Sequence, residues 1–160
     1  DCVITTLLGS CVAVSLHDPL LMIGGMNHIL LPGDTGQSDT GASGRLGVHL
    51  MELLINGLLK LGASRDRLQA KLFGGARTVK GLSDIGKRNI EFSNNFLARE
   101  GIAILPGSTG GEQGRKLQFM PSSGKVRLQF MAHVQDPAPV LPPSLLRPGH
   151  LGDVELFADN

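Results

Sequence analysis

The chain of 160 residues has the length of one domain and the composition of an ordinary globular protein, with 41% hydrophobic and 18% charged residues. Its apolar stretches are all shorter than the ~18 residues that a membrane-spanning helix requires, so we expect no membrane insertion. The net charge of +1 conceals an uneven distribution, because residues 61–135 hold twelve basic and five acidic side chains. This excess predicts either a surface for an acidic partner or the solvated faces of helices and strands.

Two further classes of function are disfavoured by composition. The basic residues are dispersed and the chain has no Trp or Tyr for base stacking, so we expect no nucleic-acid binding. Cys2 and Cys11 are too few for a disulfide framework and form no Cys-x-x-Cys zinc motif. A bond between them remains an alternative to the simpler expectation of free thiols in a reducing cytoplasm. The chain starts at Asp1 without Met, so we expect a leading segment, with any targeting signal it carried, to be missing.

Periodicity predicts a domain with many hairpins. Alternating runs indicate strands, and leucines at helical spacing before Gly62 indicate the first of two helices. The expected strands are residues 3–8, 11–17, 25–31, 68–73, 102–105, 116–120 and 125–131, and the expected helices are residues 45–61 and 83–100. So many hairpins do not suit a doubly wound sheet, and they favour an α+β fold with mixed β-sheets and two main helices.

Two segments outside these elements are polar or proline-rich. Residues 32–44 form a glycine-rich loop directly after the second strand of the first hairpin, where it could be a wall or lid of a site or a simple connector. Residues 137–160 begin with a proline-rich run and are predicted to be an extended tail. The predicted organisation is therefore one domain over residues 1–136 and a tail over residues 137–160.

The pairing of Cys11 with His28 is the main chemical feature of the sequence. If the first hairpin turns between Pro19 and Leu20, Cys11 lies directly opposite His28, with Cβ atoms roughly 4.5–5.5 Å apart. At that separation a thiol and an imidazole form a nucleophile and its base, and the imidazole lowers the pKa of the thiol. Backbone N–H groups of the turn before Cys11 would bind an oxyanion.

Cys11 and His28 could each also have a purely structural role. Cys11 could be a small core side chain, and His28 shares its strand face with apolar neighbours. A third group should orient the imidazole, and a hydroxyl from Thr5 or Thr6 is available on opposite faces of the preceding strand. Further candidates for this role are Asn27, Asp34 and Asp39.

Other motifs are weaker. The segment around Ser10 lacks the second glycine of a Gly-x-Ser-x-Gly elbow, which disfavours a serine hydrolase. Residues 74–76 (Gly-Gly-Ala) match neither phosphate-binding pattern and are interpreted as a turn. The remaining histidines have no metal-ligand spacing. These are His17, His49, His133 and His150.

Residues 7–14 (Leu-Leu-Gly-Ser-Cys-Val-Ala-Val) and residues 24–28 (Gly-Gly-Met-Asn-His) closely resemble the chemoreceptor glutamine deamidase family, CheD. The resemblance runs from residue 3 to about residue 131. It continues through residues 73–76 (Phe-Gly-Gly-Ala), residues 85–89 (Ile-Gly-Lys-Arg-Asn), Gly110, Gly111, Arg115 and residues 123–126 (Ser-Gly-Lys-Val).

The resemblance implies a cysteine-dependent protein-glutamine deamidase of bacterial chemotaxis, with Cys11 as nucleophile, His28 as base and Thr5 rather than Thr6 as the assisting threonine. It implies a three-layer fold similar to toxin deamidases and a reaction that requires no metal or organic cofactor. The implied partners are the cytoplasmic coiled coil of chemotaxis receptors and, in some bacteria, a chemotaxis phosphatase. The alternative function is a non-catalytic module that docks on receptors or on that phosphatase, which the basic residues 61–135 and the polar loop would serve.

Overall fold

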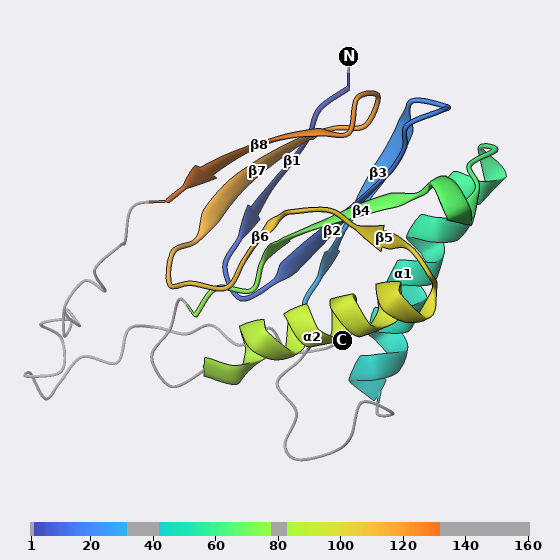
Figure 1. The fold of residues 1–160 in the computed structure, drawn as a ribbon. Coiled ribbons are helices and arrows are strands. Elements are labelled where there is room, and N and C mark those ends of the chain that lie inside the picture. Colours follow the sequence, from blue (N-terminus) through green and yellow to red (C-terminus); the bar gives the residue numbers. More distant parts are fainter. Residues whose placement is uncertain (1, 32–41, 78–82, 132–160) are drawn as a thin grey trace, which may run out of the picture.

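The structure is a computed structural model that describes residues 2–31, 42–77 and 83–131. Two β-sheets lie face to face, and two helices cover the far face of the second sheet, which gives three layers (Figure 1). The predicted α+β class with mixed sheets and two main helices is thereby confirmed. The likeness to toxin deamidases stays a prediction.

The first sheet is antiparallel and has the strand order β1-β7-β8. Its strands are β1 (Ile4–Leu8), β7 (Arg115–Met120) and β8 (Lys125–Phe130). Burial alternates along β7, because one side of each strand packs on the second sheet while the other side faces outward. Leu8, Leu117 and Phe119 are the fully buried side chains of the inward face.

The second sheet is mixed and has the order β3-β2-β4-β5, with β6 also paired to β4. Its strands are β2 (Val12–Asp18), β3 (Ile23–Ile29), β4 (Gln69–Gly74), β5 (Ala103–Ile104) and β6 (Ser108–Thr109). The central strand β2 is buried on both faces. Val12 and Val14 pack in the cluster that the helices cover, whereas Ala13 packs against the first sheet.

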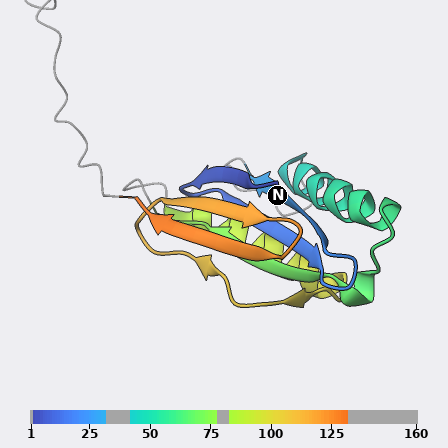
Figure 2. The same ribbon diagram turned by 90° about the horizontal axis from the view of Figure 1, so that it is seen from above.

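The helices are α1 (Ala42–Lys60) and α2 (Ser83–Arg99), with a short 3-10 turn, η1 (Arg65–Arg67), between α1 and β4. Seen from above, α2 lies behind the strands of the second sheet, α1 lies beside them, and β7 and β8 lie in front (Figure 2). The glycines predicted to follow the helices, Gly62 and Gly101, adopt left-handed φ angles of 96° and 69°. Within the described ranges, no helix is long and apolar enough to cross a membrane.

The structure adds one strand to the predicted elements and moves the start of α1, and two predicted segments lie outside the described residues. β6 forms within residues 106–114, which were expected to be turn only, and α1 begins inside the predicted loop of residues 32–44. Residues 32–41, the rest of the proposed wall or lid, lie outside the described residues. The predicted tail over residues 137–160 and its boundary with the domain also lie outside them.

The register of the β2–β3 hairpin is different from the predicted one. Ala13 lies opposite His28, so Cys11 is not the direct cross-strand partner of His28. Because the difference is two residues and side chains alternate with a period of two, Cys11 stays on the same face as His28. The two are therefore diagonal neighbours, for which a separation of roughly 7–8 Å is typical.

The Asp18 carboxylate explains the longer loop. Asp18 closes the hairpin as the last residue of β2, opposite Ile23. Its Oδ1 accepts hydrogen bonds from the backbone N–H groups of Leu20 at 3.0 Å and Leu21 at 3.3 Å. A side chain that satisfies these two amides stabilises a four-residue loop, so the turn lies further along the chain than a tight Pro19–Leu20 turn would place it.

The same carboxylate also holds the hairpin to the segment before β4. Asp18 has no exposed side-chain surface, and its Oδ2 lies 2.8 Å from Arg67 Nη2 and 3.3 Å from the Ser64 backbone nitrogen. The hydrogen bonds from Arg67, followed by those from backbone amides, lower the pKa of Asp18 to about 2. The buried charge is thus fully hydrogen-bonded, as burial of a carboxylate requires.

This low pKa predicts a pH dependence of stability. Because the folded-state pKa is below the unfolded value of roughly 4, the ionised carboxylate stabilises the fold above about pH 4 and loses that effect as the pH falls toward 2. Asp18→Asn should therefore lower the urea midpoint at pH 7 and flatten its decline between pH 5 and 2. Asp66→Asn, on the exposed neighbour, is the control. Equal acid sensitivity in Asp18→Asn and the parent would contradict the assignment.

Candidate active site

Cys11 lies in the turn between β1 and β2, at the end where the two sheets meet. Its side chain is half-buried and packs against Leu8, Ala13, Phe73 and Leu117. Both cysteines of the chain are free thiols, so the alternative of a Cys2–Cys11 disulfide is not formed. The thiol therefore has an apolar surrounding on one side, as the structural interpretation expected, and is still accessible on the other.

The backbone of residues 74–76 supports this turn. Gly75 N–H donates to the Cys11 carbonyl at 2.7 Å, and Ala76 N–H donates to the Gly9 carbonyl at 2.8 Å. Gly74 has a φ of 100°, and a Cβ there would lie 2.1 Å from the Cys11 carbonyl oxygen. Only glycine allows such an approach. Gly74 is the last residue of β4, and Gly75 and Ala76 follow it as irregular backbone rather than as the predicted turn; this segment holds the backbone of the cysteine.

Asn89 on α2 is a positioning residue that the sequence analysis did not single out. It is fully buried, its Nδ2 donates to the Ser10 carbonyl at 3.0 Å, and its Oδ1 accepts from the Leu31 backbone N–H at 2.9 Å. One side chain thus joins the turn before Cys11 to Leu31, the second residue after β3. Losing it would leave two partly buried backbone groups without this partner, at a cost of at most about 1–3 kcal/mol each.

A sequence feature could have identified Asn89. Along α2 the buried positions recur at helical spacing, and Asn89 and Ser93 occupy this buried side together with Phe96 and Leu97. A polar residue in an otherwise core-facing row requires hydrogen-bond partners. The pattern shows that partners exist, but which backbone groups they are depends on the tertiary fold.

His28 on β3 is exposed and hydrogen-bonded to a threonine of the neighbouring sheet. Its Nδ1 lies 3.0 Å from Thr6 Oγ1. The sequence analysis assigned this role to Thr5, but Thr5 points to the opposite, outward side of β1, where it is exposed and pairs with Gln118 of β7. The side chains of β1 alternate, so only Thr6 can reach a histidine on the second sheet.

The other candidates for orienting His28 do not contact it in the described part of the chain. Asn27 precedes His28 on β3 and therefore faces the helices. Its Oδ1 accepts from the Val14 backbone N–H at 3.3 Å, and its Nδ2 lies 3.2 Å from Met51 Sδ. Asp34 and Asp39 lie outside the described residues.

The ionisation of Cys11 also differs from the expectation. Burial raises the pKa of the Cys11 thiol, and the hydrogen bond from its own backbone N–H opposes this effect only in part. The predicted lowering by an adjacent imidazole requires direct cross-strand contact, which the observed register replaces with a diagonal arrangement. In the free protein the thiol is therefore protonated at neutral pH.

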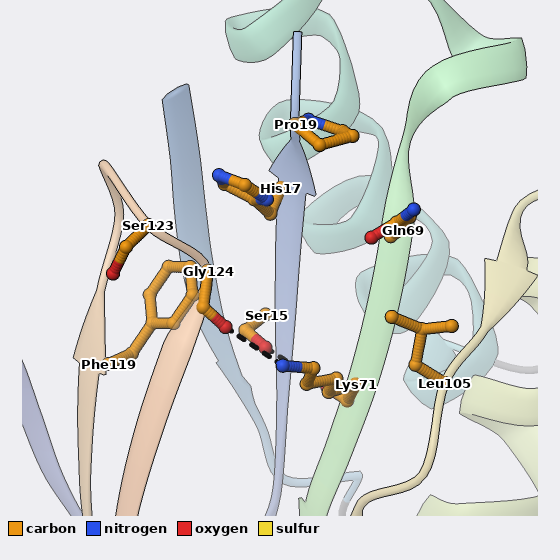
Figure 3. Close-up of a pocket in the computed structure, with 9 residues that line it drawn as sticks. All are labelled: Ser15, His17, Pro19, Gln69, Lys71, Leu105, Phe119, Ser123 and Gly124. Carbon is orange, nitrogen blue, oxygen red and sulfur yellow. Dashed lines mark hydrogen bonds between the residues drawn. The ribbon is translucent and has the colours of Figure 1, made fainter. Parts of the chain in front are cut away.

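A separate hollow of about 170 Å³ lies between the sheets (Figure 3). There Lys71 Nζ donates to the Gly124 carbonyl at 2.9 Å, and His17 Nε2 lies 3.4 Å from the Ser122 carbonyl. A Cβ on Gly124 would lie 2.6 Å from the imidazole of His17. These polar contacts join the β7–β8 turn to the second sheet. The lining contains neither cysteine nor His28, so the hollow does not serve the Cys11 chemistry.

Fold and site together define a class: an α+β domain in which a half-buried cysteine and a threonine-bound histidine share one face at the junction of two sheets. Comparison with known proteins gives the family. The family model described as CheD chemotactic sensory transduction matches residues 30–130. This chain belongs to the CheD family.

Several curated relatives have the same name, probable chemoreceptor glutamine deamidase CheD. The protein of Sinorhizobium medicae (strain WSM419) is 56% identical over 134 residues, covering 83% of this chain and 73% of that protein. The protein of Agrobacterium fabrum (strain C58 / ATCC 33970) is 58% identical over 127 residues, covering 79% and 70%. The protein of Caulobacter sp. (strain K31) is 50% identical over 157 residues, covering 97% and 84%.

The raised pKa of Cys11 predicts slow alkylation of the thiol. In a Cys2→Ser background, the rate of iodoacetamide labelling of Cys11 should rise with pH at higher values in the folded protein than in urea, because only the thiolate reacts and burial delays its formation. Mass spectrometry of quenched samples measures the rate. A folded-state curve at lower pH than the curve in urea would instead show that His28 stabilises the thiolate.

Proposed function

We propose that this protein is a glutamine deamidase that converts glutamine side chains of methyl-accepting chemotaxis receptors to glutamate and releases ammonia. Membership of the CheD family and the name shared by the relatives support the reaction and its substrate. The observation that carries a cysteine-dependent mechanism is the half-buried Cys11 on the same face as His28.

The reaction proceeds in two halves. The Cys11 sulfur attacks the glutamine carboxamide carbon while His28 takes the thiol proton, and backbone N–H groups of the Ser10–Cys11 turn bind the oxyanion. Collapse of the tetrahedral intermediate breaks the C–N bond, with His28 returning the proton so that ammonia leaves. Water, deprotonated by His28, then attacks the thioester, and glutamate is released with the free thiol.

Thr6 holds His28 in the tautomer that this reaction requires. For Nε2 of His28 to accept a proton from sulfur, Nδ1 must carry hydrogen and donate it to Thr6 Oγ1, which lies 3.0 Å away. Thr6 is therefore a positioning residue rather than a group that touches the substrate. Thr5, the threonine that the family resemblance implies, is the alternative holder of this role.

The raised pKa of the free thiol suits an enzyme activated by its substrate. A protonated, half-buried cysteine resists oxidation and alkylation. A glutamine side chain that enters beside Cys11 displaces water, and a modest rotation of diagonal side chains brings sulfur and imidazole within hydrogen-bond reach. The thiolate then forms as it attacks.

The proposed substrate implies the cellular location of the protein and the partners that it contacts. A cytoplasmic enzyme would act on the helical coiled coil of the receptors, and a chemotaxis phosphatase is a second candidate partner. A module that only docks on these partners remains the alternative function, and the packing of Cys11 against a hydrophobic cluster favours it.

The nucleophile and base assignments predict that Cys11→Ala and His28→Ala each lower ammonia release by at least about a thousandfold, because neither half-reaction can proceed without them. Mass spectrometry of a receptor cytoplasmic fragment detects each deamidation as a gain of roughly one dalton, and circular dichroism checks folding. Asn56→Ala, on an exposed side chain bonded within α1, is the control. Full activity of Cys11→Ala would favour the docking module.

The two threonines can be separated by the same assay. Thr6→Val removes the hydroxyl that holds His28 and should lower kcat about tenfold, with a smaller change in KM and an altered pH profile. Thr5→Val changes an outward hydroxyl and should leave the pH profile as in the parent. Thr6→Ser, which keeps the hydroxyl, should restore most of kcat. The reverse order of Thr5→Val and Thr6→Val would return the role to Thr5.

A further inference from the structure

The outward face of the first sheet is positively charged and has no compensating acidic residue. Lys116 on β7 and Lys125 and Arg127 on β8 point away from the second sheet and are exposed. The strands β1, β7 and β8 contain no aspartate or glutamate. Together with the outward side chains beside them, these cations form what we call the basic face. It consists of Leu7, Lys116, Gln118, Lys125, Arg127 and Gln129.

The cations of the basic face are unpaired within the described residues. Lys116, Lys125 and Arg127 form no ion pair there, and their side chains donate no hydrogen bond. Elsewhere the chain pairs exposed cations with carboxylates, as in Arg77–Glu112 and Lys87–Glu91. Three like charges on one small sheet repel each other, and an acidic partner would relieve that repulsion.

The basic face begins at the strand that contacts the candidate site. Thr6 of β1 holds His28, and its neighbour Leu7 points outward, 58% exposed, opposite Lys116 in the register of β1 and β7. Figure 1 shows this sheet on the side of the molecule away from α1 and α2. A partner that lies across the basic face therefore reaches the edge at which Cys11 and His28 are placed.

The dimensions of the basic face suit a helix. Three strands at a spacing of roughly 4.8 Å span about 10 Å between the outer strands, which matches the diameter of an α-helix with its side chains. Leu7 supplies an apolar contact at one border, and the cations on the middle and far strands supply contacts for carboxylates.

We propose that the basic face binds an acidic α-helical segment of the receptor whose glutamine enters the site. This inference rests on the proposed deamidase function and assigns to the sheet the recognition of the substrate outside the reacting side chain. Electrostatic attraction at this face would act mainly on the association rate and on KM, and added salt would weaken it.

The test compares two substrates of the full chain. One is a receptor cytoplasmic fragment, and the other is a neutral peptide of about ten residues around one of its glutamines. The double variant Lys116→Glu with Arg127→Glu should raise KM for the fragment at least tenfold while kcat changes less than twofold. Its kcat/KM for the peptide should change less than twofold, because the peptide is too short and uncharged to use the basic face.

A matched control reverses two cations of the helices, Lys60→Glu with Arg99→Glu, and should leave both substrates as in the parent. Added salt should lower kcat/KM for the fragment in the parent much more than in the Lys116/Arg127 variant. An unchanged KM in that variant, or an equal rise in the control, would overturn the inference.

The remaining outcomes separate this inference from its alternatives. If the Lys116/Arg127 variant loses binding to vesicles of anionic lipid but keeps the parental KM for the fragment, the basic face contacts membranes and the inference is wrong. If the parent deamidates the peptide and the fragment, and the variant acts on both equally well, only the inference fails. If the parent deamidates neither, the proposed function itself is wrong and the inference falls with it.

Discussion

The candidate site depends on one buried amide, the side chain of Asn89. Cys11 and His28 lie on different segments, and Asn89 bonds to the backbone of both, at Ser10 directly before Cys11 and at Leu31, three residues after His28. Because the amide itself has no exposed surface, its hydrogen bonds are formed in surroundings from which water is largely excluded. The helix α2 thus ties the segment that carries Cys11 to the segment that carries His28 through their backbones.

Glycines near Asn89 allow α2 to approach the turn closely enough for Asn89 to form these hydrogen bonds. A Cβ on Gly86 would lie 2.5 Å from the carbonyl oxygen of Gly75, so α2 approaches the turn at backbone distance. Gly75 in turn donates to the carbonyl of Cys11. Arg115 holds the other side of this turn, donating to the carbonyls of Gly74 and two further residues of the β6 region. The cysteine is positioned by close backbone packing, which leaves its side chain free for chemistry.

Much of this fold follows from periodicity and from turn residues. The helices end at glycines as predicted, and every expected strand forms within a few residues of its predicted bounds. The short strand β6 was missed because two residues paired to β4 have no periodicity of their own. The shared face of Cys11 and His28 was predictable from alternation, whereas their register depends on hydrogen bonds that Asp18 makes to loop amides.

The choice between Thr5 and Thr6 shows a different limit. Alternation in the sequence predicts that the two threonines lie on opposite faces of one strand. It does not indicate which face meets the second sheet. That orientation is set by Leu8 and its packing partners, which turn the even-numbered side of β1 inward. A residue assigned from the motif spacing of a family can therefore be the sequence neighbour of the residue that contacts the histidine.

The loop after Asp18 has a consequence for how this family can vary in length. Because side chains alternate along β3, a change of one residue in the loop would place Asn27 on the face of Cys11 and turn His28 toward the helices. A change of two residues would slide the strand but keep the histidine on its face. A change of loop length that shifts the pairing of β2 and β3 therefore keeps Cys11 and His28 on one face only where the shift is an even number of residues.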